Sequence, residues 1–148
     1  MDFSIQLKSP PKELFEVLID FEKFPVLIPR QLKDVKIISN KGNEIVTEEI
    51  LVFKTIIKNE INQKCIHKIE DNKLNTKILT GPAKDTLVEI SLTPNDSGTN
   101  IFVNINLKLI LKAKVFLPLI KKIYKNLLTG IFYKMDNLIL EKKSGEIK

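Results

Sequence analysis

The last long segment of the chain constrains its fold most, because residues 115–142 keep a helical pattern for roughly 28 positions, about 42 Å of helix. Pro118 is tolerated only in the first turn, where its missing N–H is not needed, so we expect the helix to begin near Val115 or Phe116. At about 100° per residue, one side of this helix is apolar and carries Phe116, Ile120, Ile123, Leu127, Ile131, Met135 and Leu138.

The apolar arc of this helix is wider than a helix lying flat on a core requires. Its flanks widen the arc to about 200° and consist of Leu117, Leu119, Tyr124, Leu128 and Ile139. The polar side is formed by Lys121, Lys122, Lys125, Asn126, Thr129, Tyr133, Asp136 and Asn137. We therefore expect another element, such as a curved sheet, to wrap around the helix.

The central part of the chain alternates apolar and polar residues for about eighty positions, which is typical of strands half exposed to solvent. Strands are expected at 32–39, 44–54, 56–70, 73–80, 85–94 and 100–111, after a first strand at 3–7. Short polar turns at 40–43, 70–72, 81–82 and 95–98 separate them. Such turns predict hairpins and hence an antiparallel meander.

Two short helices are expected between the first and second strands. Ser9 is the expected N-cap of the first helix and is followed by prolines at its entry. The buried stripe of this helix is expected to consist of Leu14, Phe15, Leu18 and Ile19. Residues 20–25 predict a second short helix, and Pro29 closes the pair. The sequence thus predicts one α+β domain over residues 1–148, with a curved antiparallel seven-stranded sheet around a long C-terminal helix.

Composition limits the location and partners of the protein. The longest apolar run, residues 115–120, is too short to span a bilayer, and the start of the chain lacks a secretory pattern. A single cysteine, Cys65, fits a reducing compartment, so a cytoplasmic location is expected. Arg30 is the only arginine among 24 basic residues, and nucleic-acid readout depends heavily on arginine. Nucleic-acid binding is therefore not expected, despite a net charge of +6.

Three stretches give the chain a family resemblance. Residues 9–18 look like the opening helix, residues 20–25 with Pro29 like an aspartate–aromatic–proline signature, and residues 81–99 like a late hairpin pair. In this order they resemble the START-like or Bet v 1-like (SRPBCC) superfamily, and within it the polyketide cyclase/coenzyme Q-binding branch. The resemblance implies a helix-grip fold, β-α-α-β6-α. The chain departs from many relatives in having no tryptophan.

The resemblance also implies a cavity between the sheet and the long helix, since these elements cannot fill the space between them completely. Pockets of this kind are mostly apolar, with a few polar groups that orient the ligand. For each candidate residue of the apolar lining, plain core packing is the favoured interpretation. The candidates are Phe24, Leu27, Leu51, Phe53, Ile61, Ile78, Ile90, Leu107, Phe116, Ile120, Ile123, Tyr124, Leu127 and Ile131.

Along the strand expected at 56–70, every second residue should face the core. The polar residues among these inward-facing positions are the candidates for orienting a ligand. Asn59, Gln63 and His67 could bind a carbonyl or hydroxyl group, because a buried polar group without a partner costs about 1–3 kcal/mol. His67 could instead look outward through a bulge. The direction of Glu49 is unresolved, and pairing with a lysine across the sheet is favoured over a place in the pocket.

Two further residues of the long helix are unusual for their positions. Lys134 lies among apolar neighbours on the helical wheel, and its side chain is expected to extend out past the sheet edge. Gly130 costs about 1 kcal/mol relative to alanine, and it could make room for a ligand or for a close strand. The close strand is the favoured interpretation.

The chemistry available in the sequence favours binding over catalysis. No nucleophile–base pair, metal-ligand spacing or phosphate-binding glycine loop is present, so neither a metal nor a cofactor is expected. We hypothesise a carrier of a hydrophobic small molecule, such as an isoprenoid quinone or another lipid. Two alternatives implied by the resemblance are a polyketide cyclase/aromatase-like or dehydratase-like enzyme, and a ribosome- or protein-associating member of the branch. The oligomeric state stays open.

Several lysines gather near the start of the long helix. They could make transient contact with an anionic membrane surface during ligand transfer, and they are Lys112, Lys114, Lys121, Lys122 and Lys125.

Overall fold

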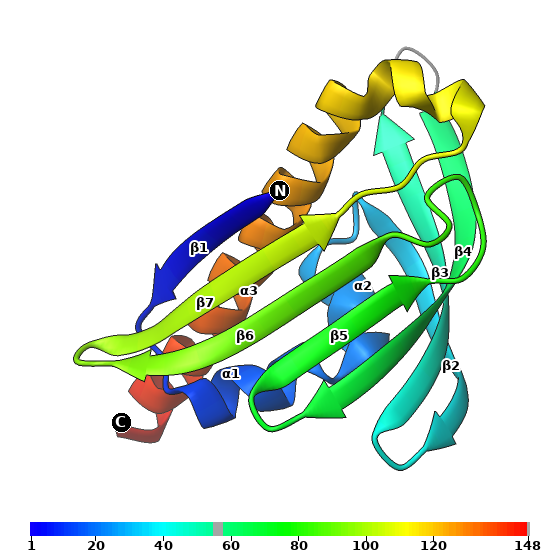
Figure 1. Cartoon of the computed structure of the whole chain (residues 1–148). Helices are drawn as coiled ribbons and strands as arrows, with labels where there is room; N and C mark the ends of the chain where they lie inside the picture. The colour runs from blue at the N-terminus through cyan, green and yellow to red at the C-terminus, as the bar shows by residue number, and fades with distance from the viewer. Residues whose placement is uncertain (55–57, 148) are drawn as a thin grey trace.

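One curved antiparallel sheet packs around the C-terminal helix α3 (Figure 1). The computed structural model describes residues 1–54 and 58–147. The seven strands lie in the order β1-β7-β6-β5-β4-β3-β2, so neighbours in sequence pair except where β1 closes against β7. Their bounds are Asp2–Leu7 (β1), Leu32–Lys41 (β2), Glu44–Lys54 (β3), Lys58–Glu70 (β4), Lys73–Ile78 (β5), Leu87–Asn95 (β6) and Gly98–Asn106 (β7). The predicted α+β helix-grip architecture is confirmed.

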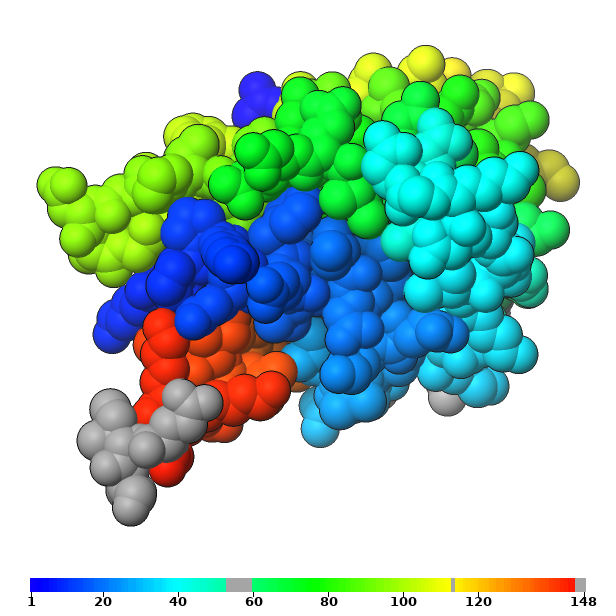
Figure 2. All heavy atoms as spheres, turned by 90° about the horizontal axis from the view of Figure 1, so that it is seen from below, coloured from blue at the N-terminus to red at the C-terminus, as the bar shows by residue number. Residues whose placement is uncertain are grey.

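The helices lie on one face of the sheet. They are α1 (Pro11–Leu18), the 3₁₀ helix η1 (Phe21–Lys23), α2 (Phe24–Leu27), the 3₁₀ helix η2 (Leu111–Phe116) and α3 (Leu117–Ile147). Seen from below, the segment from α1 to α2 fills space between the sheet and α3 (Figure 2). Pro118 lies in the first turn of α3, as predicted, although the helix begins one or two residues later than expected.

The start of α1 differs from the prediction. Pro10, not Ser9, occupies the N-cap, and the Ser9 hydroxyl makes no capping bond and has no hydrogen-bond partner among the described residues. Ser9 is instead fully buried, with its carbonyl oxygen accepting the Thr99 hydroxyl at 2.7 Å. The serine therefore joins the loop before α1 to the sheet.

Two expected strands end early because their backbones turn to other partners. β5 stops at Ile78, and Thr80 is exposed, with its Oγ1 accepting the Lys64 N–H at 2.9 Å. β7 stops at Asn106, after which the Lys108 N–H donates to Thr86 Oγ1 at 3.0 Å. The segment after β5 stays beside β4 through Lys64 and leads to β6, whereas the chain after β7 leads to η2.

The inner face of the sheet carries the residues that alternation assigned to it. Gln63, Cys65 and His67 of β4 are buried, and so are Val88, Ile90 and Leu92 of β6. Ile101, Val103 and Ile105 of β7 are at most 2% exposed. The core therefore lies between this face and the helices.

Burial along α3 is uneven. Its buried residues are concentrated toward the C-terminal half, whereas Phe116 just before the helix is 56% exposed and Leu119 is 45% exposed. Phe132, which the helical wheel did not assign to the apolar side, is completely buried. Asp136, assigned to the polar side, is only 5% exposed, so that assignment is wrong. The C-terminal half of α3 packs on the core, and the N-terminal half has looser contacts.

Candidate functional site

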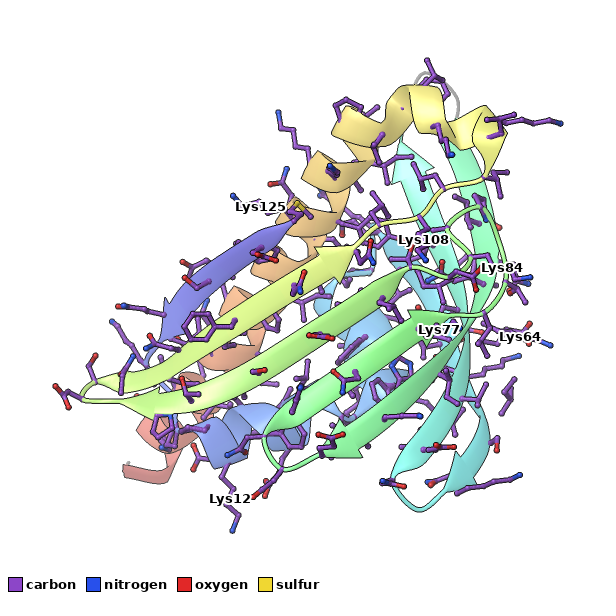
Figure 3. The ribbon with its side chains drawn as sticks, viewed as in Figure 1. Lys12, Lys64, Lys77, Lys84, Lys108 and Lys125 are labelled. Atoms are coloured by element: carbon purple, nitrogen blue, oxygen red, sulfur yellow. The ribbon has the colours of Figure 1, made fainter. Side chains whose placement is uncertain are left out.

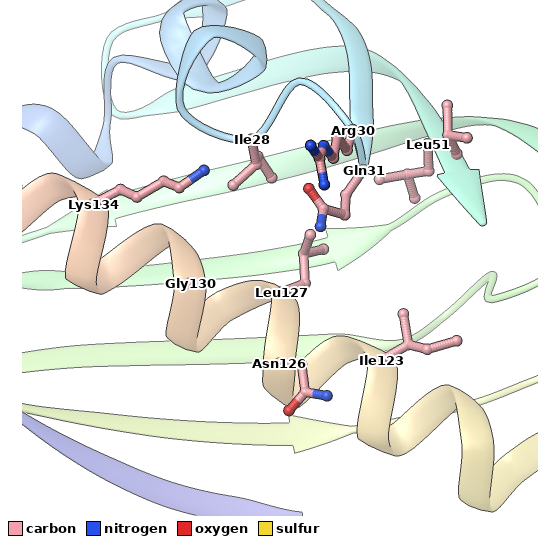
Figure 4. Close-up of a pocket in the computed structure, with 10 residues that line it drawn as sticks. Ile28, Arg30, Gln31, Leu51, Ile123, Asn126, Leu127, Gly130 and Lys134 are labelled. Atoms are coloured by element: carbon pink, nitrogen blue, oxygen red, sulfur yellow. The ribbon is translucent and has the colours of Figure 1, made fainter. Parts of the chain in front are cut away.

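A cavity of about 480 Å³ lies where the N-terminal half of α3 faces the α2–β2 connection and the end of β3 (Figure 4). Its volume falls in the range of about 300–1,000 Å³ that is usual for small-molecule sites. It is partly open to solvent. The lining consists of Ile28, Arg30, Gln31, Leu51, Val52, Ile123, Asn126, Leu127, Gly130 and Lys134.

Gly130 borders this cavity from the middle of α3. A Cβ atom built on it would have no heavy atom within 4 Å beyond its immediate surroundings in the helix, so no strand approaches it closely. The favoured interpretation of a close strand is therefore wrong. The missing side chain leaves space on the cavity side of the helix.

The aliphatic and polar lining residues differ in character. Ile28 and Leu51 are buried, and Ile123 and Leu127 are partly buried, so they offer an apolar surface. Arg30 and Lys134 are exposed at the cavity edge. The expected extension of Lys134 past the sheet edge is wrong, because its Nζ reaches α2 and donates to the Leu27 carbonyl oxygen at 2.6 Å.

The structure places the predicted lining residues in several environments. Leu51, Ile123 and Leu127 line the cavity. Ile78, Ile90, Tyr124 and Ile131 are buried in the core, and Phe116 is exposed. The side chains of Phe53 and Asn59 lie outside the described part of the structure. The remaining predicted residues are partly buried against the core, namely Phe24, Leu27, Ile61, Leu107 and Ile120.

A polar cluster lies on the inner face of β3 and β4. Glu49 points inward, with its side chain 16% exposed, and it pairs in register with Gln63. Gln63 Nε2 donates to Glu49 Oε1 at 3.2 Å and to Cys65 Sγ at 3.5 Å. Thr47 Oγ1 lies 2.9 Å from Glu49 Oε2. The expected pairing of Glu49 with a lysine across the sheet is therefore wrong.

His67 belongs to the same cluster and is only 5% exposed. Its Nε2 lies 2.9 Å from Thr47 Oγ1, and its Nδ1 lies 2.7 Å from Thr76 Oγ1. Its ring stacks on Phe21 with the centroids 4.1 Å apart. Gln63 and His67 are thus held by protein partners, and neither lines the cavity.

Burial shifts the proton affinities of this cluster. It raises the pKa of Glu49 above 4.5, although hydrogen bonds from Thr47 and Gln63 oppose the shift. It lowers the pKa of His67 to about 4, so the imidazole is neutral at pH 7. The pKa values of Cys65 and Tyr124 are raised, chiefly by burial and also by the nearby Glu49 charge. The raised pKa values of Glu49, Cys65 and Tyr124 and the lowered pKa of His67 all favour the neutral form of each side chain. The cluster therefore disfavours charge.

The hydrogen bonds of the cluster form a chain from Thr76 through His67 and Thr47 to Glu49. When Glu49 is ionised, Thr47 donates to it, His67 Nε2–H donates to Thr47, and Thr76 donates to Nδ1. When Glu49 is protonated, every donor in the chain can reverse. The proton on Glu49 is therefore linked to the tautomer of His67.

Within residues 1–54 and 58–147, no group of three or more His, Cys, Asp or Glu side chains could hold a metal ion. In that part of the chain, no helix has both the length and the apolar character needed to cross a membrane.

The architecture is shared with solved structures of very different sequence. No family model matches the chain, and no curated protein gives a significant match. The Zhui aromatase/cyclase from Streptomyces sp. R1128 is 11% identical, with 94% of each chain covered and a TM-score of 0.76. A START superfamily protein from Mycobacterium smegmatis is 14% identical, with 95% of this chain and 97% of that chain covered and a TM-score of 0.74.

A di-domain aromatase/cyclase is also similar in structure. The chain matches StfQ of the steffimycin biosynthetic pathway with 10% identity and a TM-score of 0.82, over 97% of its own length and 52% of that protein. The chain thus spans about half of the di-domain protein. These likenesses show the fold: the chain has the helix-grip fold of these START superfamily and aromatase/cyclase structures, as predicted from its sequence.

Sequence reasoning missed one side of the cavity. Ile28, Arg30 and Gln31 follow the short helix α2, where the sequence shows only a break at Pro29. One signal was present, since Arg30 is the sole arginine in a chain whose other basic residues are lysines.

Proposed function

We propose that the protein binds and carries a hydrophobic small molecule, such as an isoprenoid quinone or another lipid, in the cavity between α3 and the α2–β2 connection. The observation that carries the proposal is the aliphatic lining of that cavity together with the space left by Gly130. Cavities of this size with an apolar lining are typical of ligand sites.

Mild purification from the native source followed by organic extraction and mass spectrometry tests the proposal. A hydrophobic compound recovered in a one-to-one ratio with the protein is the expected result. Protein recovered without a ligand but together with ribosomal particles would favour the alternative of a ribosome-associating protein. Against that alternative, the lysines are spread over several elements, including Lys12 on α1, Lys77 on β5 and Lys125 on α3 (Figure 3).

A second function is catalysis of the aromatase/cyclase or dehydratase kind. The buried carboxyl group of Glu49 speaks for it, because burial raises the pKa of this group and acids with shifted pKa values often lie at catalytic sites, but Glu49 does not line the cavity. Two structural neighbours carry aromatase/cyclase names. The two functions differ in what happens to the bound molecule: a carrier returns it unchanged, and an enzyme returns a cyclised or dehydrated product. Mass spectra of the ligand before and after incubation with the protein distinguish them.

Transient contact of η2 and the start of α3 with an anionic membrane surface would serve ligand transfer. Residues 97–135 contain no acidic residue, and exposed apolar side chains lie beside the lysines of this region. Among them, Leu111 is 83%, Val115 76% and Phe116 56% exposed. Lysines near an anionic surface contribute about 1 kcal/mol each, and inserted apolar side chains add to this.

Co-sedimentation with vesicles tests this contact. Binding is expected to phosphatidylserine-containing vesicles and not to pure phosphatidylcholine, and to weaken as salt rises. Replacing Lys121 and Lys122 with glutamine should reduce the binding by about 2 kcal/mol. Exposed lysines elsewhere, Lys12 and Lys142, provide the matched control pair. If the Lys121/Lys122 variant and the Lys12/Lys142 variant bind the vesicles equally well, a contact localised at the start of α3 is refuted.

A further inference from the structure

We propose that the hydrophobic ligand carries an anionic group, a carboxylate or a phosphate, and that Arg30 and Lys134 bind this group at the mouth of the cavity. This inference rests on the proposed carrier function and specifies the class of its ligand. It assigns the two cations of the lining a role in recognition that the apolar surface cannot provide.

The charge of the cavity lining is one-sided. Of its ten residues, two are cationic, Arg30 and Lys134, and none is acidic. The polar neighbours are Gln31 and Asn126, whose side-chain amides can donate hydrogen bonds to oxygen. Figure 4 shows the Arg30 and Gln31 side chains beside Leu127, with Lys134 reaching toward Ile28 from α3. The cations thus border the aliphatic surface from two different elements.

The donors of both cations are incompletely used within the described residues. Arg30 takes part in no side-chain hydrogen bond or ion pair there, although its guanidinium group has five N–H donors. One of the three N–H donors of the Lys134 ammonium group donates to the Leu27 carbonyl oxygen. That bond fixes the ammonium group near the cavity and leaves two donors for a ligand. A carboxylate or phosphate is the group that such donors bind best.

The apolar lining makes these charges more effective than exposed charges elsewhere on the surface. A tail packed against Leu51, Ile123 and Leu127 would hold the acidic group at the mouth, so the anion would not lose freedom separately. Exposed ion pairs are worth little alone, whereas charge-assisted hydrogen bonds are stronger. We therefore expect an acid to bind about tenfold more tightly than its neutral ester.

A fluorescence titration with cis-parinaric acid and its methyl ester at neutral pH tests the inference. The wild-type protein should prefer the acid, and the Arg30→Gln/Lys134→Gln double variant should lose most of this preference while binding the ester as before. Glutamine at 134 can still donate to the Leu27 carbonyl oxygen. Arg30→Lys and Lys134→Arg retain the charges and should restore the preference. Lys142→Gln removes an exposed charge from α3 outside the cavity and should change nothing.

The outcomes separate the inference from the proposed function. Equal affinity of the wild-type protein for acid and ester overturns the anionic ligand and leaves the carrier intact. Binding of neither compound counts against both. A preference for the acid that survives in the double variant overturns the assignment to Arg30 and Lys134. The same titration with an alkyl phosphate distinguishes a phosphate from a carboxylate as the preferred group.

Discussion

The carboxylate of Asp136 on α3 accepts the backbone N–H of Ser9 at 2.8 Å, across 127 positions of sequence. The same carboxylate accepts the Lys8 N–H at 3.2 Å. These bonds fix the C-terminal half of α3 to the loop between β1 and α1. The N-terminal half carries no such anchor among the described residues, and it is there that the cavity lies.

Replacing Asp136 tests this anchor. Asp136→Ala would leave two backbone N–H groups without acceptors, one of them on the fully buried Ser9, and should lower the free energy of unfolding by about 3 kcal/mol. Asp136→Asn keeps one acceptor oxygen and should cost less. Urea denaturation measures both. Asn137→Ala, at the adjacent exposed position, is the control, and an equal loss there would contradict a specific anchor.

Gly130 offers a way to separate stability from binding. Gly130→Ala places a methyl group in open space and should stabilise the protein by about 0.5–1 kcal/mol through helix propensity. Gly130→Leu should remain folded but fill part of the cavity, lowering ligand affinity about tenfold or more. Thermal unfolding and ligand titration give the two quantities. Gly145→Ala, in the same helix with equally open surroundings, should leave binding unchanged.

His67 makes stability depend on acidity. Its pKa is about 4 in the folded protein and near the ordinary 6.5 in the unfolded chain, so the unfolded state binds more protons between these values. The contribution of His67 is therefore present above pH 6.5 and is lost as pH falls toward 4, by about 3 kcal/mol in total. His67→Gln should lack this dependence when unfolding is followed across the range. An unchanged pH profile would show that the imidazole does not resist protonation.

Glu49 acts in the opposite direction. Since burial raises its pKa, the folded state binds more protons above pH 4.5, and stability falls as pH rises through that window. Glu49→Gln should thus stabilise the protein, by more near pH 8 than near pH 5. Glu48→Gln removes a carboxylate at the next position, on the other side of the strand, and controls for net charge. A destabilised Glu49→Gln variant at high pH would contradict an unfavourable buried charge.

The sheet was predictable because local pattern and burial agree. The expected strand 44–54 matches β3, and the inner parity of β4 is that read from alternation. The expected end of the last strand was wrong because its alternation continues to residue 111, whereas backbone bonds to Thr86 and Pro82 take the chain elsewhere. Those partners are distant in sequence, so no local pattern reveals them.

The site was less predictable than the fold. A helical wheel places Asp136 on the polar side of the helix and so treats it as a solvated charge. The backbone N–H groups that donate to its carboxylate belong to Lys8 and Ser9, in a loop near the other end of the chain, and a helical wheel does not include them. Helix propensity predicts that Gly130 destabilises the helix relative to alanine, but it does not predict whether another element fills the space beside this residue. The strand that contains Glu49 has apolar and polar residues on both of its faces, so the sequence alone does not show which way Glu49 points. The pairing of Glu49 with Gln63 in the sheet shows that it points inward.

The proposed carrier function requires that the cavity beside α3 is the ligand site. Methyl-labelled protein titrated with oleate and followed by NMR tests this directly. The resonances of Leu51, Ile123 and Leu127 are predicted to shift together and to saturate at one equivalent of ligand. Unchanged resonances at these three residues, with shifts confined to exposed side chains such as Leu111 or Val115, would contradict it.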